Sequence, residues 1–255
     1  MTAPVVETRA LAKSFGGHRV LKGVDLTVTP GESLVVIGGS GSGKSVLLRT
    51  ILGLEAADAG TVLLNGEPAS PAARARFMRD FGMLFQNAAL FDSLPVWRNV
   101  AFRLLRMMPA AQARARAVER LARVGLGPEV ADRMPANLSG GMRKRVGLAR
   151  AIATDPKVIF FDEPTTGLDP QRVAAISRLI RGIVTETGAT AVTITHDMAS
   201  ARIIADRVAL LDQGRVRWQG PVAQMDRADD PVLRAFIRGE PLDWVPLAPG
   251  PAERR

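Results

Sequence analysis

The segment Gly38 to Ser45, "GGSGSGKS", has the residue types and the spacing of a phosphate-binding loop. Glycines let backbone N–H groups approach phosphate oxygens, a lysine reaches the β- and γ-phosphates, and a serine hydroxyl suits Mg²⁺. An apolar run, "SLVVIGG", leads into the loop, and a helix-forming run, "VLLRTILGL", leaves it. We therefore predict nucleotide binding by Gly38, Gly39, Ser40, Gly41, Ser42, Gly43, Lys44, Ser45 and Val46.

Two adjacent carboxylates, Asp162 and Glu163, end the apolar run "KVIFF". In an open α/β sheet, ligands bind at the carboxyl ends of the strands. Asp162 is suited to hold Mg²⁺ through its water shell, and Glu163 to polarise a water molecule against the γ-phosphate. The alternative, an exposed acidic turn before Pro164, is the weaker interpretation beside a phosphate-binding loop.

Single polar or aromatic residues follow other predicted strands. His196 comes after "TAVTIT" and Gln86 after "GMLF", so both are expected at the same edge as the carboxylates. Phe15 is a candidate to stack on adenine, although a core position is the commoner fate of phenylalanine. His18 is expected to be only a turn residue. We predict catalytic roles for Glu163, His196 and Gln86, and metal binding by Ser45, Gln86 and Asp162.

A second glycine-rich segment, "LSGGMRKR", spans Leu138 to Arg145. Ser139 and the two glycines after it suit the capped start of a helix, which we predict over Met142 to Thr154. The first turn of that helix would carry Arg143, Lys144 and Arg145. Cations normally lie at helix C-termini, where the helix dipole favours them. A broken local rule of this kind often marks a functional site.

The elements that must position these residues alternate in a recognisable order. Short β-rich runs and turns at the N-terminus predict an antiparallel β subdomain. Residues 91–137 have helical periodicity and no strand candidate, so they predict a helical insertion. Strands and helices then alternate, which is typical of a parallel sheet covered by helices. The sequence therefore predicts an α/β fold with a parallel-sheet core, and its proline-rich end predicts a tail.

Composition excludes some classes of function. The chain of 255 residues has no cysteine, which excludes disulfides and thiolate metal sites. We find no leader-like segment and no run of roughly 18 apolar residues, so we expect a soluble or peripheral protein. The net charge of +9 predicts an arginine-rich solvated surface, with anionic lipid headgroups or nucleic acid as alternative partners. Stacking aromatics for nucleic acid are scarce, since tyrosine is absent.

In combination, these motifs resemble the nucleotide-binding subunits of ABC transporters over nearly the whole chain. The resemblance implies an ATPase with ATP and Mg²⁺ as cofactors. It also implies a nucleotide-binding domain at residues 1–240, a helical subdomain at about 91–150 within it, and a tail at 241–255. The matching positions are Phe15 (adenine stacking), Gly38–Ser45 (Walker A), Gln86 (Q-loop), Leu138–Gly141 (signature), Val158–Glu163 (Walker B), Gly167–Asp169 (D-loop) and His196 (switch histidine).

The same resemblance implies that two cassettes pair head to tail as a homodimer. Ser139, Gly140 and Gly141 of one copy would then face the γ-phosphate held by the phosphate-binding loop of the other. This explains why one chain carries two glycine-rich anion sites. The cationic turn that follows is expected to add to the field, since an ammonium–phosphate pair at 4 Å is worth roughly 4 kcal/mol at an effective dielectric of 20.

Three stretches are similar to the ATPase of bacterial Mce-type phospholipid transporters, the maintenance-of-lipid-asymmetry system. The first is the signature segment, where Met142 replaces the glutamine that usually follows it. The second is "MLFQNAALFDSLPVWRNVAF" and the third is "DPVLRAFIRGEPLDW". This resemblance implies a peripheral protein on the cytoplasmic face of the inner membrane. Its permease would meet residues 91–100 with a coupling helix. Further partners would be a small STAS-domain subunit, reached by the C-terminal extension, and a periplasmic Mce lipid-binding protein.

Two alternatives stay open. The cassette could serve another cargo, such as an amino acid, a metal or a peptide. A soluble ABC ATPase acting on nucleic acid is disfavoured, because such proteins usually carry two cassettes, a long coiled coil or a zinc site. This chain has one cassette, no heptad run and no cysteine, so we expect no nucleic-acid partner.

Overall fold

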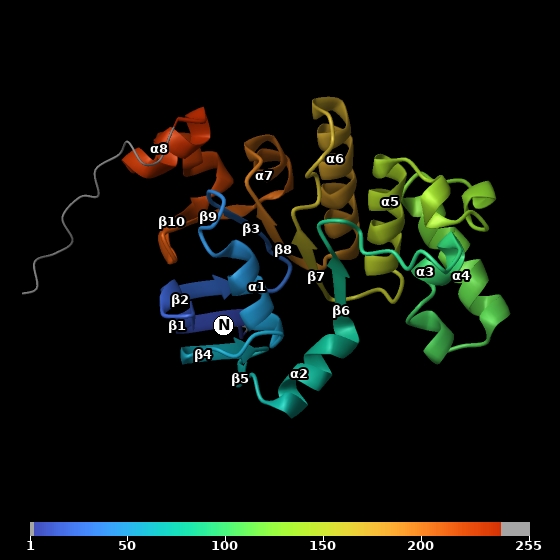
Figure 1. The fold of residues 1–255 in the computed structure, drawn as a ribbon, viewed down its shortest axis with the longest axis horizontal. Coiled ribbons are helices and arrows are strands. Elements are labelled where there is room, and N and C mark those ends of the chain that lie inside the picture. The colour runs from blue at the N-terminus through green and yellow to red at the C-terminus, as the bar shows by residue number, and fades with distance from the viewer. Residues whose placement is uncertain (1–2, 241–255) are drawn as a thin grey trace, which may run out of the picture.

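The computed structural model describes residues 3–240, so the predicted tail at 241–255 lies outside the described residues. Its strands form two sheets (Figure 1). The antiparallel sheet has the order β2-β1-β4-β5, and the second has the order β10-β9-β3-β8-β7-β6. The strands are β1 Val6–Phe15, β2 His18–Val28, β3 Ser33–Ile37, β4 Ala59–Leu64, β5 Glu67–Pro68, β6 Phe81–Leu84, β7 Val158–Asp162, β8 Thr190–Thr195, β9 Arg207–Asp212 and β10 Arg215–Pro221.

The second sheet is parallel from β9 to β6, and only β10 at its edge runs antiparallel. The predicted α/β fold, with an antiparallel N-terminal sheet and a parallel core, is therefore confirmed. The helices are α1 Lys44–Leu52, α2 Pro71–Phe77, α3 Val96–Val100, α4 Ala110–Arg123, α5 Gly140–Ala151, α6 Pro170–Thr187, α7 Met198–Ile204 and α8 Pro231–Arg238, with short 3₁₀ turns between several of them.

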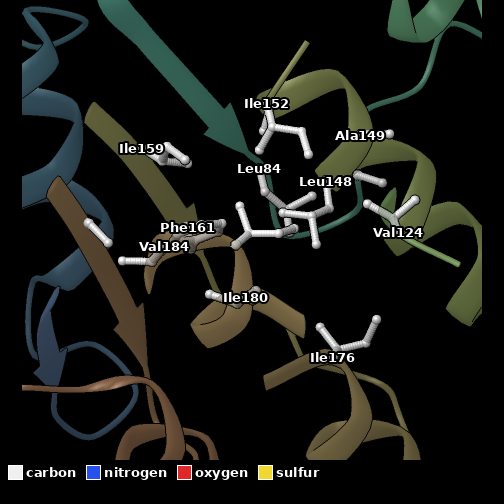
Figure 2. Packing of buried hydrophobic residues seen from close by; sticks show 14 of the residues in the cluster. Leu84, Val124, Leu148, Ala149, Ile152, Ile159, Phe161, Ile176, Ile180 and Val184 are labelled. Atoms are coloured by element: carbon white, nitrogen blue, oxygen red, sulfur yellow. The ribbon is translucent and has the colours of Figure 1, made fainter. Parts of the chain in front are cut away.

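Strand β3 shows why the parallel sheet is buried on both faces. All five of its residues are buried, as expected of a continuous apolar run. Leu34 and Val36 point into a core shared with α1 and the antiparallel sheet. Val35 and Ile37 point into the opposite core, which the helices of the C-terminal half cover. Figure 2 shows part of this second core, where side chains of β6, β7, α5 and α6 meet.

The middle of the chain is helical, as predicted. Within residues 3–240, no strand lies between β6 and β7, and α3, α4 and α5 pack against one another there. Asn99 of α3 is fully buried, and its side chain bonds the backbone N–H and C=O of Phe91 and the C=O of Leu94. These bonds fix the loop that precedes α3.

Helix α5 begins earlier and ends earlier than predicted. It spans Gly140–Ala151 instead of Met142–Thr154, because both glycines are helical and Ser139 is the N-cap. Arg143 is therefore the fourth residue of the helix, and Lys144 and Arg145 lie beyond the first turn, where the effect of the helix dipole is weaker. Among residues 3–240, no helix is both long enough and apolar enough to cross a bilayer.

Candidate active site

The phosphate-binding loop joins the end of β3 to the start of α1. Gly41 and Gly43 have φ angles of 77° and 107°, which side chains of L-residues rarely adopt. Gly43 is the N-cap of α1 and offers no side-chain cap, so the first N–H groups of the helix are left for an anionic ligand. The local sequence thus folds into a loop with the backbone geometry that the motif predicts, and anion binding by this loop stays a prediction.

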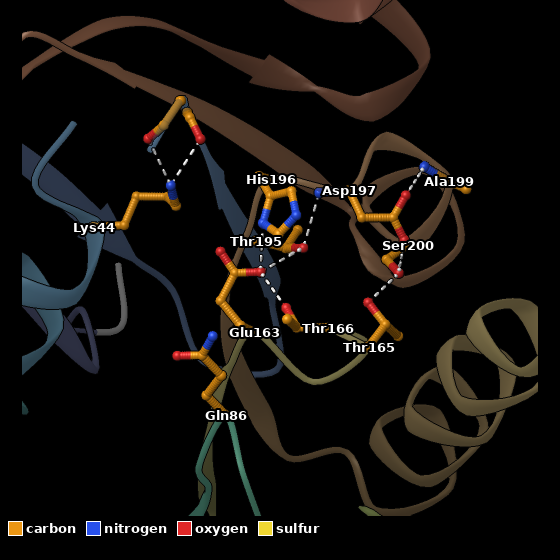
Figure 3. A network of polar contacts seen from close by, with 12 residues as sticks. Lys44, Gln86, Glu163, Thr165, Thr166, Thr195, His196, Asp197, Ala199 and Ser200 are labelled. Carbon is orange, nitrogen blue, oxygen red and sulfur yellow. Dashed lines mark hydrogen bonds and ion pairs between the residues drawn. The ribbon is translucent and has the colours of Figure 1, made fainter. Parts of the chain in front are cut away.

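The ammonium group of Lys44 lies over this loop. It donates to the carbonyl oxygens of Gly38 at 2.7 Å and Gly39 at 2.9 Å (Figure 3). Burial lowers the pKa of Lys44, while the charges of Glu163 and Asp162 oppose that effect. The lysine is therefore held inside the site beside both carboxylates.

Glu163 follows β7 in an unusual backbone conformation. Its φ angle is 47°, in the left-handed region, and its N–H donates to the carbonyl of Ile194 at 2.9 Å. The carboxylate atom Oε2 lies 2.9 Å from His196 Nδ1 and accepts from the Thr166 hydroxyl at 3.1 Å. The Glu163 side chain is only 11% exposed, whereas that of His196 is 57% exposed. This geometry brings together two residues that the sequence places at separate strand ends.

Asp162, the residue before Glu163, shows whether the site suits Mg²⁺. Its Oδ1 atom is buried and has no hydrogen-bond partner among the described residues. Burial, followed by the charge of Glu163, raises the pKa of Asp162. Asp162 precedes Glu163, which lines the same cavity as Ser45 and Gln86. The carboxylate, hydroxyl and amide oxygens of Asp162, Ser45 and Gln86 are hard donors of the kind that Mg²⁺ prefers. The residues present therefore fit this metal.

One cavity of about 940 Å³ joins the phosphate-binding loop to the carboxylate edge. The predicted site residues that line it are Gly39, Ser40, Gly41, Gly43, Lys44, Ser45, Val46, Gln86, Glu163 and His196. Gly38, Ser42, Asp162 and Phe15 are not in its lining, although the first three adjoin residues that are. A single cavity thus holds a lysine, a glutamine, a glutamate and a histidine from four different elements or loops.

The expectation for His18 was wrong. It is the first residue of β2 and lines the cavity, because β2 runs beside the phosphate-binding loop at Gly43. Phe15 pairs with His18 across the β1–β2 hairpin, and the Lys13 ammonium lies 5.1 Å from the centre of its ring. Phe15 is 41% exposed, so its stacking on adenine stays a prediction.

Residues at and just after the end of α8 also line the cavity and were missed from the sequence. Phe236, Gly239 and Glu240 form part of its wall. Arg217 of β10 binds Asp230, the N-cap of α8, and this pair holds the helix beside the sheet. The amphipathic pattern of α8 was readable, but its packing beside the phosphate-binding loop depends on contacts between distant parts of the chain.

The signature residues lie elsewhere. None of Ser139, Gly140 and Gly141 lines the cavity of about 940 Å³ that the described residues form. A cleft of about 160 Å³ is lined by Ser139 and Gly141, and another of about 370 Å³ is lined by Gly140. Ser139 Oγ accepts from the N–H of Met142 at 3.3 Å. Within residues 3–240, the start of α5 therefore shares no described cavity with the phosphate-binding loop.

The expectation that three cations add their field to this helix start needs correction. Lys144 turns inward and donates to the carbonyl oxygens of Gln86 and Glu163. Arg145 donates to the carbonyls of Val124 and Gly125, each at 3.3 Å. Only Arg143 has an exposed position. Two of the three cations therefore hold the backbone of their own chain.

A hydroxyl network supports the carboxylate edge (Figure 3). The Thr195 hydroxyl lies 3.5 Å from Glu163 Oε2 and accepts from the N–H of Asp197 at 3.0 Å. Asp197 accepts from Ser200 at 2.6 Å, and Ser200 lies 3.0 Å from the Thr165 hydroxyl. The network thus links the segment after β7 with the segment after β8, so Glu163 and His196 are held relative to each other.

The fold and this cavity define a class, the ATPases built on a phosphate-binding loop. The model of the ABC transporter family matches residues 21–166, more than half of the chain. The methionine import ATP-binding protein MetN of Caulobacter vibrioides is 46% identical over 241 residues, which cover 92% of this chain and 72% of that one. This chain belongs to the ABC transporter family and is the ATPase that powers a transporter.

Other relatives and solved structures agree. The probable ribonucleotide transport ATP-binding protein mkl of Mycobacterium tuberculosis is 38% identical over 248 residues, covering 95% of this chain and 69% of that one. The dimeric structure of MJ0796, a bacterial ABC transporter cassette, is 31% identical with a TM-score of 0.78, covering 85% of this chain and 98% of that one. The predicted fold and the predicted ATPase activity are both confirmed.

Proposed function

We propose that this chain hydrolyses ATP within a pair of identical copies and powers a membrane permease that moves phospholipid. One observation carries the ATPase part of this proposal. Lys44, Gln86, Glu163 and His196 all line the cavity that the phosphate-binding loop opens into. Four other cavities of the described residues lack this combination of a phosphate-binding loop, a carboxylate and an imidazole.

In this proposal each residue has one task. The loop residues Gly38 to Val46 bind the phosphates through backbone N–H groups and the Lys44 ammonium. Ser45, Gln86 and Asp162 would hold Mg²⁺, and the bound metal would supply positive charge to the phosphate oxygens. Glu163 accepts a proton from the attacking water as general base. His196 contacts Glu163 with Nδ1 and leaves its other ring nitrogen for the γ-phosphate.

A second copy completes the site. Ser139, Gly140 and Gly141 lie outside the cavity, yet they form a helix N-terminus of the kind that binds anions. The solved cassette MJ0796 is dimeric, which supports a pair of cassettes here too. We infer that the start of α5 in one copy covers the γ-phosphate bound by the other, so that ATP holds the dimer together and hydrolysis releases it.

An apolar groove supports the permease partner. It has a volume of about 590 Å³ and is lined by exposed aromatic side chains that include Phe85, Phe91 and Phe102. The rings of Phe91 and Phe102 lie 4.6 Å apart. Exposed aromatic residues around one groove are typical of a protein-binding surface. We propose that the coupling helix of the permease binds here, at and beside residues 91–100.

The phospholipid cargo rests on the same groove. The stretch that resembles the Mce-type ATPases, residues 83–102, supplies Phe85, Phe91 and Phe102. The residues that carry this resemblance therefore line the surface that would recognise the permease, and the permease selects the cargo. A small STAS-domain subunit and a periplasmic Mce protein complete the proposed assembly at the inner membrane.

Methionine is the second candidate cargo. The relative MetN is named as a methionine import protein and is more similar in sequence than mkl, which is named for ribonucleotide transport. The cargoes in these two names differ although the cassettes are alike. Similarity of the cassette alone does not identify the cargo, so the partner must be determined directly.

The test is to purify the tagged full-length chain from membranes and identify its partners and bound small molecules. We expect a permease, an Mce-domain protein, a STAS-domain subunit and phospholipid. Recovery of an amino acid permease without lipid would overturn the phospholipid cargo and leave the ATPase assignment in place.

The groove is tested by Phe91→Asp, with Met107→Asp as its control. Met107 is also an exposed apolar residue, at 68%, but it is not in the lining of the groove. We expect Phe91→Asp to lose the permease on purification while still binding ATP, and Met107→Asp to retain it. Equal retention by both variants would contradict docking in this groove.

A further inference from the structure

Helix α5 approaches β6 and the segment after it more closely than a side chain would allow. A Cβ atom added at Gly147 would lie 2.7 Å from a methyl carbon of Leu84 and 3.0 Å from the Cβ of Ala88. A Cβ atom at Gly82 of β6 would collide with the carbonyl oxygen of Ala151. The helix therefore lies directly against the backbone that leads to Gln86.

Two cations flank this contact on the same side of α5. Lys144 is only 6% exposed, and its ammonium donates to the carbonyl of Gln86 and, at 3.3 Å, to the carbonyl of Glu163. Arg150 donates to the carbonyls of Ala88 and Ala89. Residues three positions apart lie on one helix face, so Lys144, Gly147 and Arg150 form one continuous contact.

Three of the four carbonyl groups that they hold, all except that of Gln86, belong to residues with strained backbone. Glu163 has a φ angle of 47°, and Ala88 and Ala89 have φ angles of 58° and 46°. Residues other than glycine persist in this region only when their surroundings hold them there. An ammonium group has three donors and no acceptor, so a single lysine can hold two carbonyl oxygens at once.

We infer that Lys144 is a positioning residue for ATP hydrolysis: it holds the backbone of Gln86 and of Glu163 in one register. This inference rests on the proposed roles of those two residues in the cavity. Lys144 itself is not in the lining of the cavity, so it acts through the residues that it holds.

The position of Lys144 has a second consequence. Ser139, Gly140 and Gly141 form the start of the same helix, about one turn before Lys144. A movement of α5 when its N-terminus meets the partner's nucleotide would therefore reach Gln86 and Glu163 through this ammonium. The inward lysine couples the half-site on α5 to the hydrolytic residues of its own chain.

The experiment compares Lys144→Met, Lys144→Gln and Lys144→Arg in the purified full-length chain. The control is Lys157→Met. Lys157 lies just before β7, its side chain is 81% exposed, and it forms an ion pair with Asp80. We expect Lys144→Met to lower kcat about tenfold to a hundredfold, since small misplacements of reacting groups have effects of that size. KM for ATP and the melting temperature should stay near those of the control.

The conservative variants make the test independent of folding. Lys144→Arg keeps the charge and several donors and should recover most of the rate. Lys144→Gln keeps one amide donor group and should lie between arginine and methionine. This ranking by donors is the result expected of a positioning residue.

Two outcomes would overturn the inference. One is a kcat for Lys144→Met within about twofold of the control. The other is a loss of kcat that follows a matching rise in KM and fall in melting temperature, which would indicate a structural role only. Glu163→Gln, measured in parallel, separates the two proposals: if it retains full turnover, the proposed function fails, and if it is inactive while Lys144→Met is normal, only the role of Lys144 fails.

Discussion

The two glycine-rich helix starts of this chain look alike in sequence but differ in structure. At α1 the N-cap is Gly43, which has a left-handed backbone and no capping side chain. At α5 the N-cap is Ser139, whose hydroxyl already accepts from the N–H of Met142. The first opens into a cavity that also contains Lys44 and Glu163, and the second opens onto shallow surface clefts.

This difference shows what a complete anion site requires. A helix N-terminus offers a favourable dipole and free N–H groups, but it contributes only a fraction of the binding. The α1 site adds a buried ammonium and two carboxylates for metal and water, all from its own chain. The α5 site adds only a hydroxyl and an exposed Arg143 nearby. In the proposed function the α5 site is therefore half of a site that a second copy completes.

The largest effect is expected at the complete site. Glu163→Gln should lower the steady-state ATPase rate about 10²- to 10⁴-fold, the usual range for loss of a general base. ATP binding should persist, because the loop and Lys44 are untouched, and light scattering should show a dimer trapped by ATP. Near-normal turnover in this variant would remove Glu163 from its role.

The next effect sets the two helix starts against each other. Lys44→Ala damages the α1 site, and Ser139→Arg blocks the α5 half-site with a bulky side chain. Each variant alone should be inactive, since every composite site of its dimer has one damaged half. An equal mixture forms about one half mixed dimers, each with one intact site, so about a quarter of the wild-type ATPase rate should return.

That recovery distinguishes a shared site from a site within one chain. If each chain completed its own site, mixing two inactive variants would restore nothing. The control is a mixture of Lys44→Ala with Glu163→Gln, which pairs two damaged halves of the same kind and should stay inactive. Recovery in this control as well would contradict the division of roles between α1 and α5.

The sequence predicted the strand, loop and helix around α1 well because their signals are local. The loop from Gly38 to Ser45, the apolar strand before it and the helix after it are neighbours in the chain, and strand ends gave the edge where Glu163 and His196 meet. The close approach of a glycine backbone to an anion and the dipole of a helix are both properties of short segments. They can be inferred from a motif with its flanking periodicity.

Other features of the site depended on packing between distant segments. The sequence placed Lys144 and Arg145 toward a ligand, yet both satisfy carbonyl groups of segments that fold against α5. It also gave no reason to place α8 beside the phosphate-binding loop or His18 in the cavity. The direction of a long side chain depends on which unpaired acceptors lie near it after folding.

A smaller effect is expected at Asp162, whose charge should lower the stability of the free protein and favour the binding of Mg²⁺-ATP. Burial and the charge of Glu163 raise the pKa of Asp162, so the folded chain binds this proton more tightly than the unfolded chain. The free energy of unfolding therefore falls as the pH rises from the pKa of Asp162 in the unfolded chain through its raised pKa in the folded chain. It stays lower at neutral pH. Asp162→Asn should raise the melting temperature without nucleotide at pH 7.

The same variant should respond less to ligand. Mg²⁺-ATP should raise the melting temperature of wild type more than that of Asp162→Asn. The stabilisation by a ligand increases with its affinity, and the variant should bind Mg²⁺-ATP more weakly. Thermal denaturation with and without Mg²⁺-ATP measures both differences. A lower melting temperature for Asp162→Asn without ligand would show that its charge is compensated in the folded chain.

The smallest effect separates the two tasks of Ser139. Loss of an N-cap hydroxyl by Ser139→Ala costs about 1 kcal/mol, whereas Ser139→Gly costs only a few tenths. For a chain of this size, 1 kcal/mol lowers the melting temperature by about 2–4 °C. If the hydroxyl serves only α5, the ATPase rate should survive both changes. If it also faces the partner's phosphate, Ser139→Gly should keep the melting temperature and still weaken ATP-dependent dimerisation, and that is the outcome the half-site predicts.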